Sequence, residues 1–300
     1  MFDVCLLGTG GMMPLPKRFL TSALLRYNGN MMLIDCGEAT QISLKMLGWG
    51  FKNINTICFT HFHADHISGL PGMLLTLSNS GRVEPLTIIG PKGVEKIVNC
   101  LRAIAPDLTF ELKFIEVTSS NVNEEILVDD FIIKTCEMKH GIPCLAYSVN
   151  VKRNGKFNLE EAERLEIPKE YWSILQRGEA VDKYTPDMVM GEERKGFKVS
   201  YCTDSRPTDE LPEFVKNSDL FICEGMYGDE EEKAKAVERK HMMFSEAAEI
   251  AKKGEVSKMW LTHFSPSLTN PADFLEVATN IFENTECGTD RKVITLKYED

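Results

Sequence analysis

Short runs of apolar, β-branched and aromatic residues alternate along the chain with longer segments whose apolar residues have helical spacing. Such short runs, bounded by polar or glycine-containing segments, are typical of buried strands. The pattern predicts strands at 2–7, 31–36, 54–60, 86–89, 131–137, 145–151, 197–203, 220–223, 258–262 and 292–298. It predicts helices at roughly 38–48, 67–79, 91–104, 207–217, 244–253 and 271–284. Alternating strands and helices without an internal repeat indicate an α/β fold.

The segment 152–196 departs from this alternation. It is rich in charged residues, poor in strand-like runs and punctuated by glycine and proline. We therefore expect one domain over 1–300, with 152–196 as an arm inserted within it.

Composition and charge exclude several classes of protein. The 300 residues are 43% hydrophobic, which is enough for a large core, and no segment is long and apolar enough to span a membrane. Nine scattered cysteines without a C-x-x-C pair argue against a disulfide framework and favour reduced thiols in the cytoplasm. The net charge of −11 disfavours non-specific binding of nucleic acid by the body of the protein. A polyanionic substrate would need metal ions or a local basic patch.

The segment 56–72, TICFTHFHADHISGLPG, holds three of the six histidines. Residues two apart in an extended segment project to one side, so His61 and His63 can offer ring nitrogens to one cation. Asp65 and His66 follow after one spacer and point in another direction, which suits a second cation. The spacing H-x-H-x-D-H therefore predicts a dinuclear metal centre. Imidazole and carboxylate ligands favour zinc, with iron or manganese as alternatives.

A dinuclear centre needs more than four ligands, and three further residues are placed to supply them. His140, Asp204 and His263 each follow an apolar run that is predicted to be a strand. Strand ends at one edge of an α/β sheet commonly build functional sites, and the two oxygens of Asp204 can bridge two cations. Taken alone, each histidine would more often be structural and a strand-end aspartate more often a turn former. Because four ligand-type residues cluster at 61–66, a metal-binding role becomes the favoured interpretation for these residues.

Other polar residues occupy related positions. Glu224 follows a predicted strand, Asp35 lies near the end of another, and His241 lies just before a predicted helix. The segment 8–14, GTGGMMP, has glycines that either cradle a phosphate or form a tight turn near the metals. It lacks the Lys-Ser/Thr ending of a phosphate-binding loop, so the glycine pattern leaves both interpretations open.

These residues carry a resemblance to a known family. THFHADH with the downstream His140, Asp204 and His263 resembles the metallo-β-lactamase superfamily of dinuclear hydrolases. The segments LLGTGGMMP, LIDCGEATQ, THFHADHISGLPGML, IIGPKG and MKHG resemble its ribonuclease Z branch, and the likeness covers almost the whole chain. The resemblance implies a four-layer αβ/βα sandwich that forms a homodimer. It also implies an arm between the His140 and Asp204 strands, where 152–196 falls.

The resemblance implies roles for the candidate residues. It assigns to two zinc ions the ligands His61, His63 and His140 on one side, Asp65, His66 and His263 on the other, and Asp204 as the bridge. Asp65 is then the proton acceptor. Glu224 and His241 match an acid pair near the scissile phosphate, in which His241 protonates the leaving 3′ oxygen or stabilises the transition state.

The same resemblance covers the substrate-binding segments less completely. Arg18 and Ser22 match a family loop that resembles Pro-x-Lys-x-Arg-Asn, and we expect them to contact the substrate. Pro16 and Phe19 replace the lysine and the asparagine of that loop. In the arm, LEIPKEYWSILQRGEAV stands where the family commonly has a Pro-Pro-Gly-Pro stretch.

The sequence therefore predicts a dinuclear-zinc phosphodiesterase, an endonuclease that removes the 3′ trailer of precursor tRNA. The alternative keeps the same fold and chemistry but acts on a small phosphodiester such as a cyclic nucleotide. A non-catalytic RNA-binding protein is disfavoured, because every expected ligand and both acid/base candidates are present. Glyoxalase-like thioester hydrolysis shares the histidine motif but does not account for DCGEATQ or for the arm.

Overall fold

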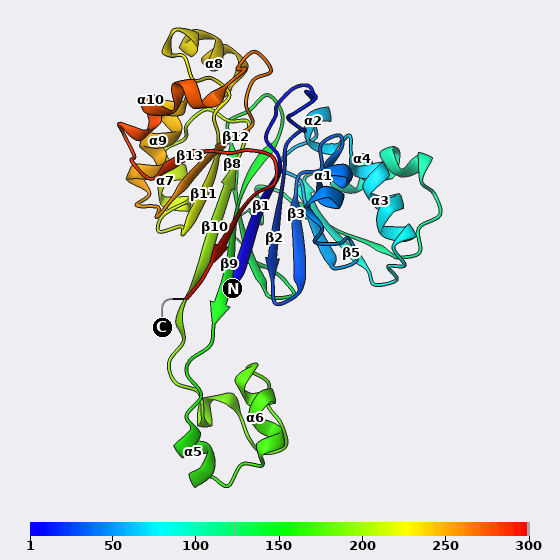
Figure 1. Cartoon of the computed structure of the whole chain (residues 1–300). Helices are drawn as coiled ribbons and strands as arrows, with labels where there is room; N and C mark the ends of the chain where they lie inside the picture. Colours follow the sequence, from blue (N-terminus) through cyan, green and yellow to red (C-terminus); the bar gives the residue numbers. More distant parts are fainter. Residues whose placement is uncertain (123, 299–300) are drawn as a thin grey trace. The chain divides into compact units, whose positions relative to one another are not determined.

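The computed structural model describes residues 1–122 and 124–298, which form two seven-stranded sheets and the helices that flank them (Figure 1). The first sheet contains, in spatial order, β14 (Lys292–Leu296), β1 (Phe2–Gly8), β2 (Ser22–Tyr27), β3 (Asn30–Ile34), β4 (Ile54–Cys58), β5 (Leu86–Pro91) and β6 (Leu112–Val117). The second contains β13 (Thr285–Cys287), β12 (Met259–Thr262), β11 (Leu220–Glu224), β10 (Arg194–Cys202), β9 (Cys144–Arg153), β8 (Phe131–Met138) and β7 (Ile126–Val128).

Both sheets are mixed, and their parallel portions require helical crossovers. Strands β3 to β6 pair in parallel, and so do β10 to β13. The crossovers of the first sheet use α1 (Thr40–Leu47), α2 (Ala64–Ile67), α3 (Leu70–Asn79) and α4 (Val94–Leu101). Those of the second use α7 (Leu211–Phe214), α8 (Lys233–Arg239), α9 (Phe244–Lys253) and α10 (Leu275–Thr279). Short 3₁₀ turns are η1 (Arg102–Ile104), η2 (Pro186–Met188), η3 (Glu230–Glu232) and η4 (Pro271–Phe274).

Alternation along the strands explains the layers. In β1, Cys5 and Leu7 join a buried cluster with Leu44 of α1 and Leu74 of α3. Phe2 is also fully buried, and its ring lies 6.2 Å from that of Phe131 in the second sheet. Successive strand residues face opposite sides, so one face of the sheet packs on helices and the other on the second sheet. This confirms the predicted four-layer α/β sandwich.

The second sheet is covered in the same way. Phe221 and Cys223 of β11 share a buried cluster with Phe244 and Ala248 of α9. Helix α9 spans Phe244–Lys253, which is the predicted range, because its apolar residues recur at helical spacing. Leu261 of β12 belongs to the same cluster, so α9 packs against both β11 and β12.

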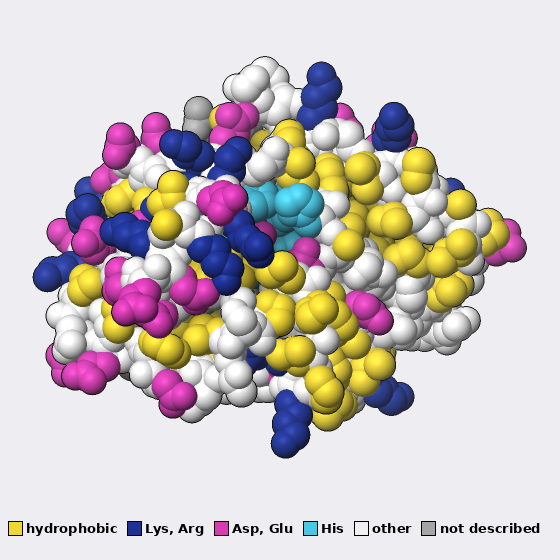
Figure 2. All heavy atoms as spheres, turned by 90° about the horizontal axis from the view of Figure 1, so that it is seen from above, with side chains coloured by type: hydrophobic (Ala, Val, Ile, Leu, Met, Phe, Trp, Pro, Cys, Tyr) yellow, Lys and Arg dark blue, Asp and Glu magenta, His cyan; other side chains and the backbone are white. Residues whose placement is uncertain are grey.

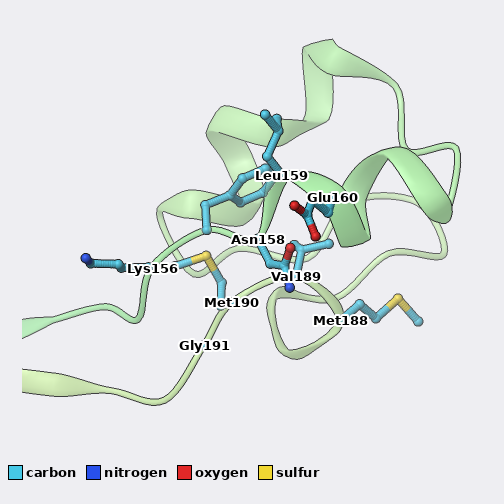
Figure 3. A pocket seen from close by; sticks show the side chains of 9 residues that line it. Lys156, Asn158, Leu159, Glu160, Met188, Val189, Met190 and Gly191 are labelled. Atoms are coloured by element: carbon cyan, nitrogen blue, oxygen red, sulfur yellow. The ribbon is translucent and has the colours of Figure 1, made fainter.

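The chain divides into two compact units, Met1–Val149 with Lys198–Asp300 and Asn150–Phe197. The second unit contains α5 (Leu159–Arg164) and α6 (Lys169–Gln176). Its own small core consists of Ala162, Ile167, Leu175 and Val189. A pocket of about 530 Å³ lies within it, lined in part by Met188 and Met190 (Figure 3).

Two further properties concern the chain as a whole. None of the helices among the described residues is long and apolar enough to cross a lipid bilayer. The nine cysteines are free thiols, and six of them are buried. The buried cysteines pack as small apolar side chains.

Candidate metal centre

Strand ends from both sheets converge at one edge of the sandwich. Strands β4, β8, β10 and β12 end one to three residues before a candidate ligand. The structure brings together all seven predicted metal-ligating side chains: His61, His63, Asp65, His66, His140, Asp204 and His263. Figure 2 shows histidines in a recess of this face, with lysine and arginine side chains on one side and hydrophobic side chains on the other.

The side chains form two groups whose ligand atoms lie within 4.8 Å of one another. The first group contains His61, His63, His140 and Asp204, and the second contains Asp65, His66 and His263. In the first, His63 Nδ1 lies 3.0 Å from His61 Nε2 and 3.2 Å from His140 Nε2. In the second, the Nε2 atoms of His66 and His263 are 3.1 Å apart. Ring nitrogens thus point at a common centre in each group.

Asp204 lies between the two groups. Its Oδ1 is 3.1 Å from Nε2 of both His66 and His263, and its Oδ2 is 3.7 Å from His61 Nε2. Despite these short distances, Oδ1 is a buried atom that makes no hydrogen bond. Buried polar atoms are nearly always hydrogen-bonded, so an unpartnered carboxylate oxygen that faces several ring nitrogens fits a cation site. The donor set and its geometry therefore suit a pair of divalent metal ions.

The pKa shifts of two of these residues agree with that fit, whereas the carboxylates of Asp204 and Asp35 raise the pKa of the buried His66 well above its usual value. Burial, reinforced by the neighbouring His66, lowers the pKa of His61 well below its usual value. Burial alone would raise the pKa of Asp204, but the facing rings of His263 and His66 hold it well below its usual range. A neutral imidazole and an ionised carboxylate are the forms that bind metals.

Asp35 orients this centre from behind and was not among the predicted site residues. Its buried carboxylate accepts hydrogen bonds from the Thr60 backbone N–H at 2.8 Å and from the Thr60 hydroxyl. It also lies 2.8 Å from His66 Nδ1, which leaves Nε2 of that ring free to face the centre. The only sequence signal for this role was its position near the end of a predicted strand.

Several residues of the centre have left-handed backbone conformations. The φ angles are 58° at Asp35, 45° at Asp204 and 55° at His263, and Met12 beside them has φ 66°. Such conformations are costly for residues other than glycine and tend to occur at functional sites. Asp35 and His263 directly follow a strand end and Asp204 lies two residues beyond one, where the turn directs the side chain into the centre.

Glu224 and His241 form a buried pair beside the two groups. His241 Nδ1 lies 3.0 Å from Glu224 Oε2, while Glu224 Oε1 accepts a hydrogen bond from Ser205 N–H. Burial would lower the pKa of His241, but the Glu224 carboxylate raises it to about 9. The ring of His241 stacks on that of His263, and these two histidines with Asp204 form a third possible ligand group.

The two predicted substrate-contacting residues are engaged within the fold. The Arg18 guanidinium donates to the backbone carbonyls of Ser265, Leu268 and Thr269, at 3.0 to 3.3 Å. The Ser22 hydroxyl is buried and donates to the Asp35 carbonyl. Neither side chain belongs to the groups of ligand atoms. Both residues support the loops around the centre.

Relatives named ribonuclease Z match the full chain. It is 53% identical to ribonuclease Z of Lachnoclostridium phytofermentans, over 100% of this chain and 99% of that protein. It is 56% identical to ribonuclease Z of Clostridium kluyveri, over all of both chains. Residues 2–162 also match a family model described as Anti-Pycsar protein Apyc1.

Solved structures share the fold at lower identity. The short form of human tRNase Z (ELAC1) superimposes with a TM-score of 0.72 at 24% identity, over 99% of this chain and 100% of that one. The metallo-beta-lactamase fold protein YhfI from Bacillus subtilis gives a TM-score of 0.71 at 19% identity, over 98% of each chain.

Proposed function

The chain belongs to the ribonuclease Z family of metal-dependent hydrolases with the metallo-β-lactamase fold, and on that premise we propose that it is an endonuclease that removes the 3′ trailer of precursor tRNA. The observation that carries the proposal is the convergence of six ligand-type side chains on Asp204, whose buried Oδ1 makes no hydrogen bond. Full-length similarity to ribonuclease Z of two species supports the choice of substrate.

The proposed cofactor is a pair of zinc ions. The proposed ligands are His61, His63 and His140 for one ion, Asp65, His66 and His263 for the other, and Asp204 for both. Manganese or iron suit the same set of donors, so zinc is the finer part of this proposal. Two such ions lower the pKa of a water molecule and neutralise charge on a bound phosphodiester.

Two groups of this chain are proposed to move protons. Asp65 is ionised, because His263 and His66 lower its pKa against the effect of burial, so it can accept a proton from the attacking water. His241, which Glu224 keeps protonated, can donate a proton to the leaving 3′ oxygen. Because the Glu224 carboxylate is fully buried and also held by Ser205 N–H, the imidazolium has a fixed orientation. General acid catalysis of this kind contributes about 10²- to 10⁴-fold.

The proposal extends to a cytoplasmic homodimer. Exposed apolar side chains on α1 and α3 support self-association: Ile42 is 52% exposed, Met46 60% and Leu75 40%. Nine free thiols suit a reducing compartment. Sedimentation of the purified protein measures the oligomeric state directly.

The experiment is an assay of the purified, zinc-loaded protein on two substrates side by side. One is a precursor tRNA with a 3′ trailer, and the other is a cyclic mononucleotide. We expect cleavage of the precursor that leaves a 3′-hydroxyl on the tRNA and a 5′-phosphate on the trailer. Protein treated with a chelator is the control, and readdition of zinc should restore cleavage.

The outcome that would overturn the tRNA assignment is hydrolysis of the cyclic nucleotide without cleavage of the precursor. The arm motivates this comparison, because LEIPKEYWSILQRGEAV stands in place of the Pro-Pro-Gly-Pro stretch expected from the family. A content of two metal ions per chain, measured on the protein used in both reactions, excludes incomplete loading as the cause.

A further inference from the structure

The loop 10–19 is held rigidly beside the metal centre. Gly11 N–H donates to the Phe264 carbonyl at 3.0 Å, and Met12 N–H donates to Asp65 Oδ2 at 2.6 Å. At its other end, Phe19 N–H donates to Asp290 Oδ2 at 2.7 Å. The loop is therefore fixed at the metal centre and at its far end, and its exposed side chains are presented in a defined place.

The tip of this loop contains a strained turn. Met13 N–H donates to the Gly11 carbonyl at 2.8 Å, which closes a three-residue turn around Met12 with φ 66°. A γ-turn with positive φ is rare and strained. Glycine would adopt it without cost, and the chain has glycine at the two preceding positions but not here. At Gly11 the reason is space, because a Cβ would lie 2.6 Å from His263 Cε1.

The side chains at the turn make little use of the protein core. Met12 is 53% exposed and Met13 is 55% exposed, although both are large and apolar. Packing therefore does not account for keeping a strained methionine at position 12. Strain that is retained without a packing benefit points to a function for the side chain outside the fold. The Met12 amide donates to Asp65, so the turn that carries these two methionines lies at the rim of the metal centre.

We infer that Met12 and Met13 form an apolar platform for the nucleobase of a nucleotide that flanks the scissile phosphodiester. The inference rests on the proposed function, because it requires an RNA strand with its phosphodiester at the centre. In RNA, only the ribose separates a phosphate from the base of the same nucleotide. A phosphodiester bound at the metal centre therefore brings a flat aromatic ring to the rim of that centre. Thioether sulfur contacts aromatic rings favourably and without a hydrogen-bond code. The platform holds the strand in place for cleavage and tolerates any base.

The test combines enzyme variants with substrates that lack one base. Precursor RNAs carry an abasic ribose either just before or just after the cleavage site, and kcat/KM is compared with that for the intact RNA. The variant is Met12→Gly with Met13→Ala, in which glycine relieves the positive φ and so preserves the turn. Ile104→Ala removes a 77%-exposed apolar side chain from η1 and is the matched control.

We expect wild-type kcat/KM to fall about two- to tenfold when the base at one of the two positions is removed. The variant should show the same loss on intact RNA and no further loss on that abasic RNA. Its Tm, metal content and sedimentation should match those of the wild type. Ile104→Ala should discriminate between the substrates as the wild type does.

Three results would overturn the inference while leaving the proposed function standing. In the first, the wild type cleaves both abasic RNAs with the same kcat/KM as the intact RNA. In the second, the double methionine variant loses as much kcat/KM on the abasic RNA as the wild type does. In the third, the variant is slowed by the same factor on every substrate, including both abasic RNAs. A change of the variant from dimer to monomer with unchanged discrimination would assign the methionines to a second copy of the chain instead. Absence of cleavage of intact RNA by the wild type would overturn the proposed function itself, and the platform with it.

Discussion

At the scale of single residues, Asp204 lies between the two groups of proposed metal ligands. It is 3% exposed, and its two oxygens face histidines of both ligand groups. Its neighbour Ser205 extends this role, because its N–H holds Glu224 and its hydroxyl accepts a hydrogen bond from Lys139 N–H. One short segment after β10 thus connects the proposed metal ligands, the Glu224–His241 pair and the loop that carries His140.

Replacing Asp204 by alanine should remove both metals and abolish cleavage. The remaining histidines would then face one another without the carboxylate that balances the charge of two cations. Elemental analysis of the purified variant measures the metal content. Asp209→Ala removes an exposed carboxylate from the same loop and should retain two metals.

His241→Ala provides the informative contrast. It should keep both metals and slow cleavage by about 10²- to 10⁴-fold, as expected for loss of a general acid. Loss of metal from this variant would instead make His241 a ligand, in the third group with Asp204 and His263. A fully metallated, active Asp204→Ala protein would contradict the bridge.

The sequence predicted the seven converging side chains because metal-ligand spacing is local and strand ends can be recognised from apolar runs. The hydrogen bonds that other residues make to these side chains could not be predicted in the same way, because their partners are distant in the sequence. Asp35 meets His66 only through folding, and Met12 meets Asp65 across 53 positions of chain. Arg18 was placed at the right loop by resemblance, but its side chain is engaged with the carbonyls of a second loop.

At the scale of elements, the short strand β13 depends on charged side chains. Glu286 accepts hydrogen bonds from Lys258 Nζ at 2.8 Å and from Trp260 Nε1 at 3.1 Å, and pairs with Lys292 at 2.8 Å. These contacts connect β13 to β12 and to the start of β14. Hydrogen bonds from Lys258 and then Lys292 lower the pKa of Glu286 to about 2.

Acidic pH should weaken the contacts of Glu286 with Lys258 and Lys292, and the Glu286→Gln variant should show how much stability depends on them. A carboxylate whose pKa is lower in the folded state than its unfolded value of about 4.3 stabilises the fold above that pH. The contribution disappears as the pH falls towards 2. The urea midpoint of the wild type, measured in chelator, should therefore fall more between pH 6 and pH 3.5 than that of the variant.

The control for this comparison is Glu249→Gln. Glu249 lies on the surface of α9 and faces Lys253 at 3.8 Å, with both side chains more than half exposed. Exposed pairs of this kind contribute little to stability. The urea midpoint of Glu249→Gln should equal that of the wild type at both pH values. An equal change of urea midpoint with pH in the two variants would contradict a specific role for Glu286.

Element prediction succeeded where sequence pattern and tertiary environment agree, as in α9. Strand β2 was missed because SALLRY lacks β-branched residues, and its pairing with β1 and β3 imposes the strand. The predicted helix over 67–79 is two elements, α2 and α3, separated at Ser68 and Gly69. Gly69 has no room for a side chain, since a Cβ would lie 2.1 Å from the Gly37 carbonyl oxygen.

At the scale of the whole molecule, the two compact units have separate cores. The core of Asn150–Phe197 contains Ala162, Leu175 and Val189, and none of these belongs to the clusters of the large unit. The proposed metal ligands all belong to the large unit. The chemistry and the arm are therefore separable in principle.

Replacing 152–195 with a short glycine–serine turn should leave a folded, metal-binding protein. We expect it to hydrolyse bis(p-nitrophenyl) phosphate at close to the rate of the full chain. For precursor tRNA we expect KM to rise about tenfold, equivalent to the loss of about 1.4 kcal/mol of binding. Circular dichroism, metal analysis and the two assays measure these outcomes. A protein that fails to fold or bind metal would show that the large unit depends on the arm.

The pairing of β1 with β14 has a consequence during synthesis of the chain. Thr295 of β14 donates to Asp3 of β1 across 292 positions, and strand register is kept from Phe2 to Leu6. Until β14 has been made, β1 has one unpaired edge, although its residues are almost entirely buried in the finished fold. An unpaired apolar edge is a template for pairing with another chain. Completion of β14 therefore ends a period in which the nascent protein is open to aggregation, long after its metal-binding motif has been translated.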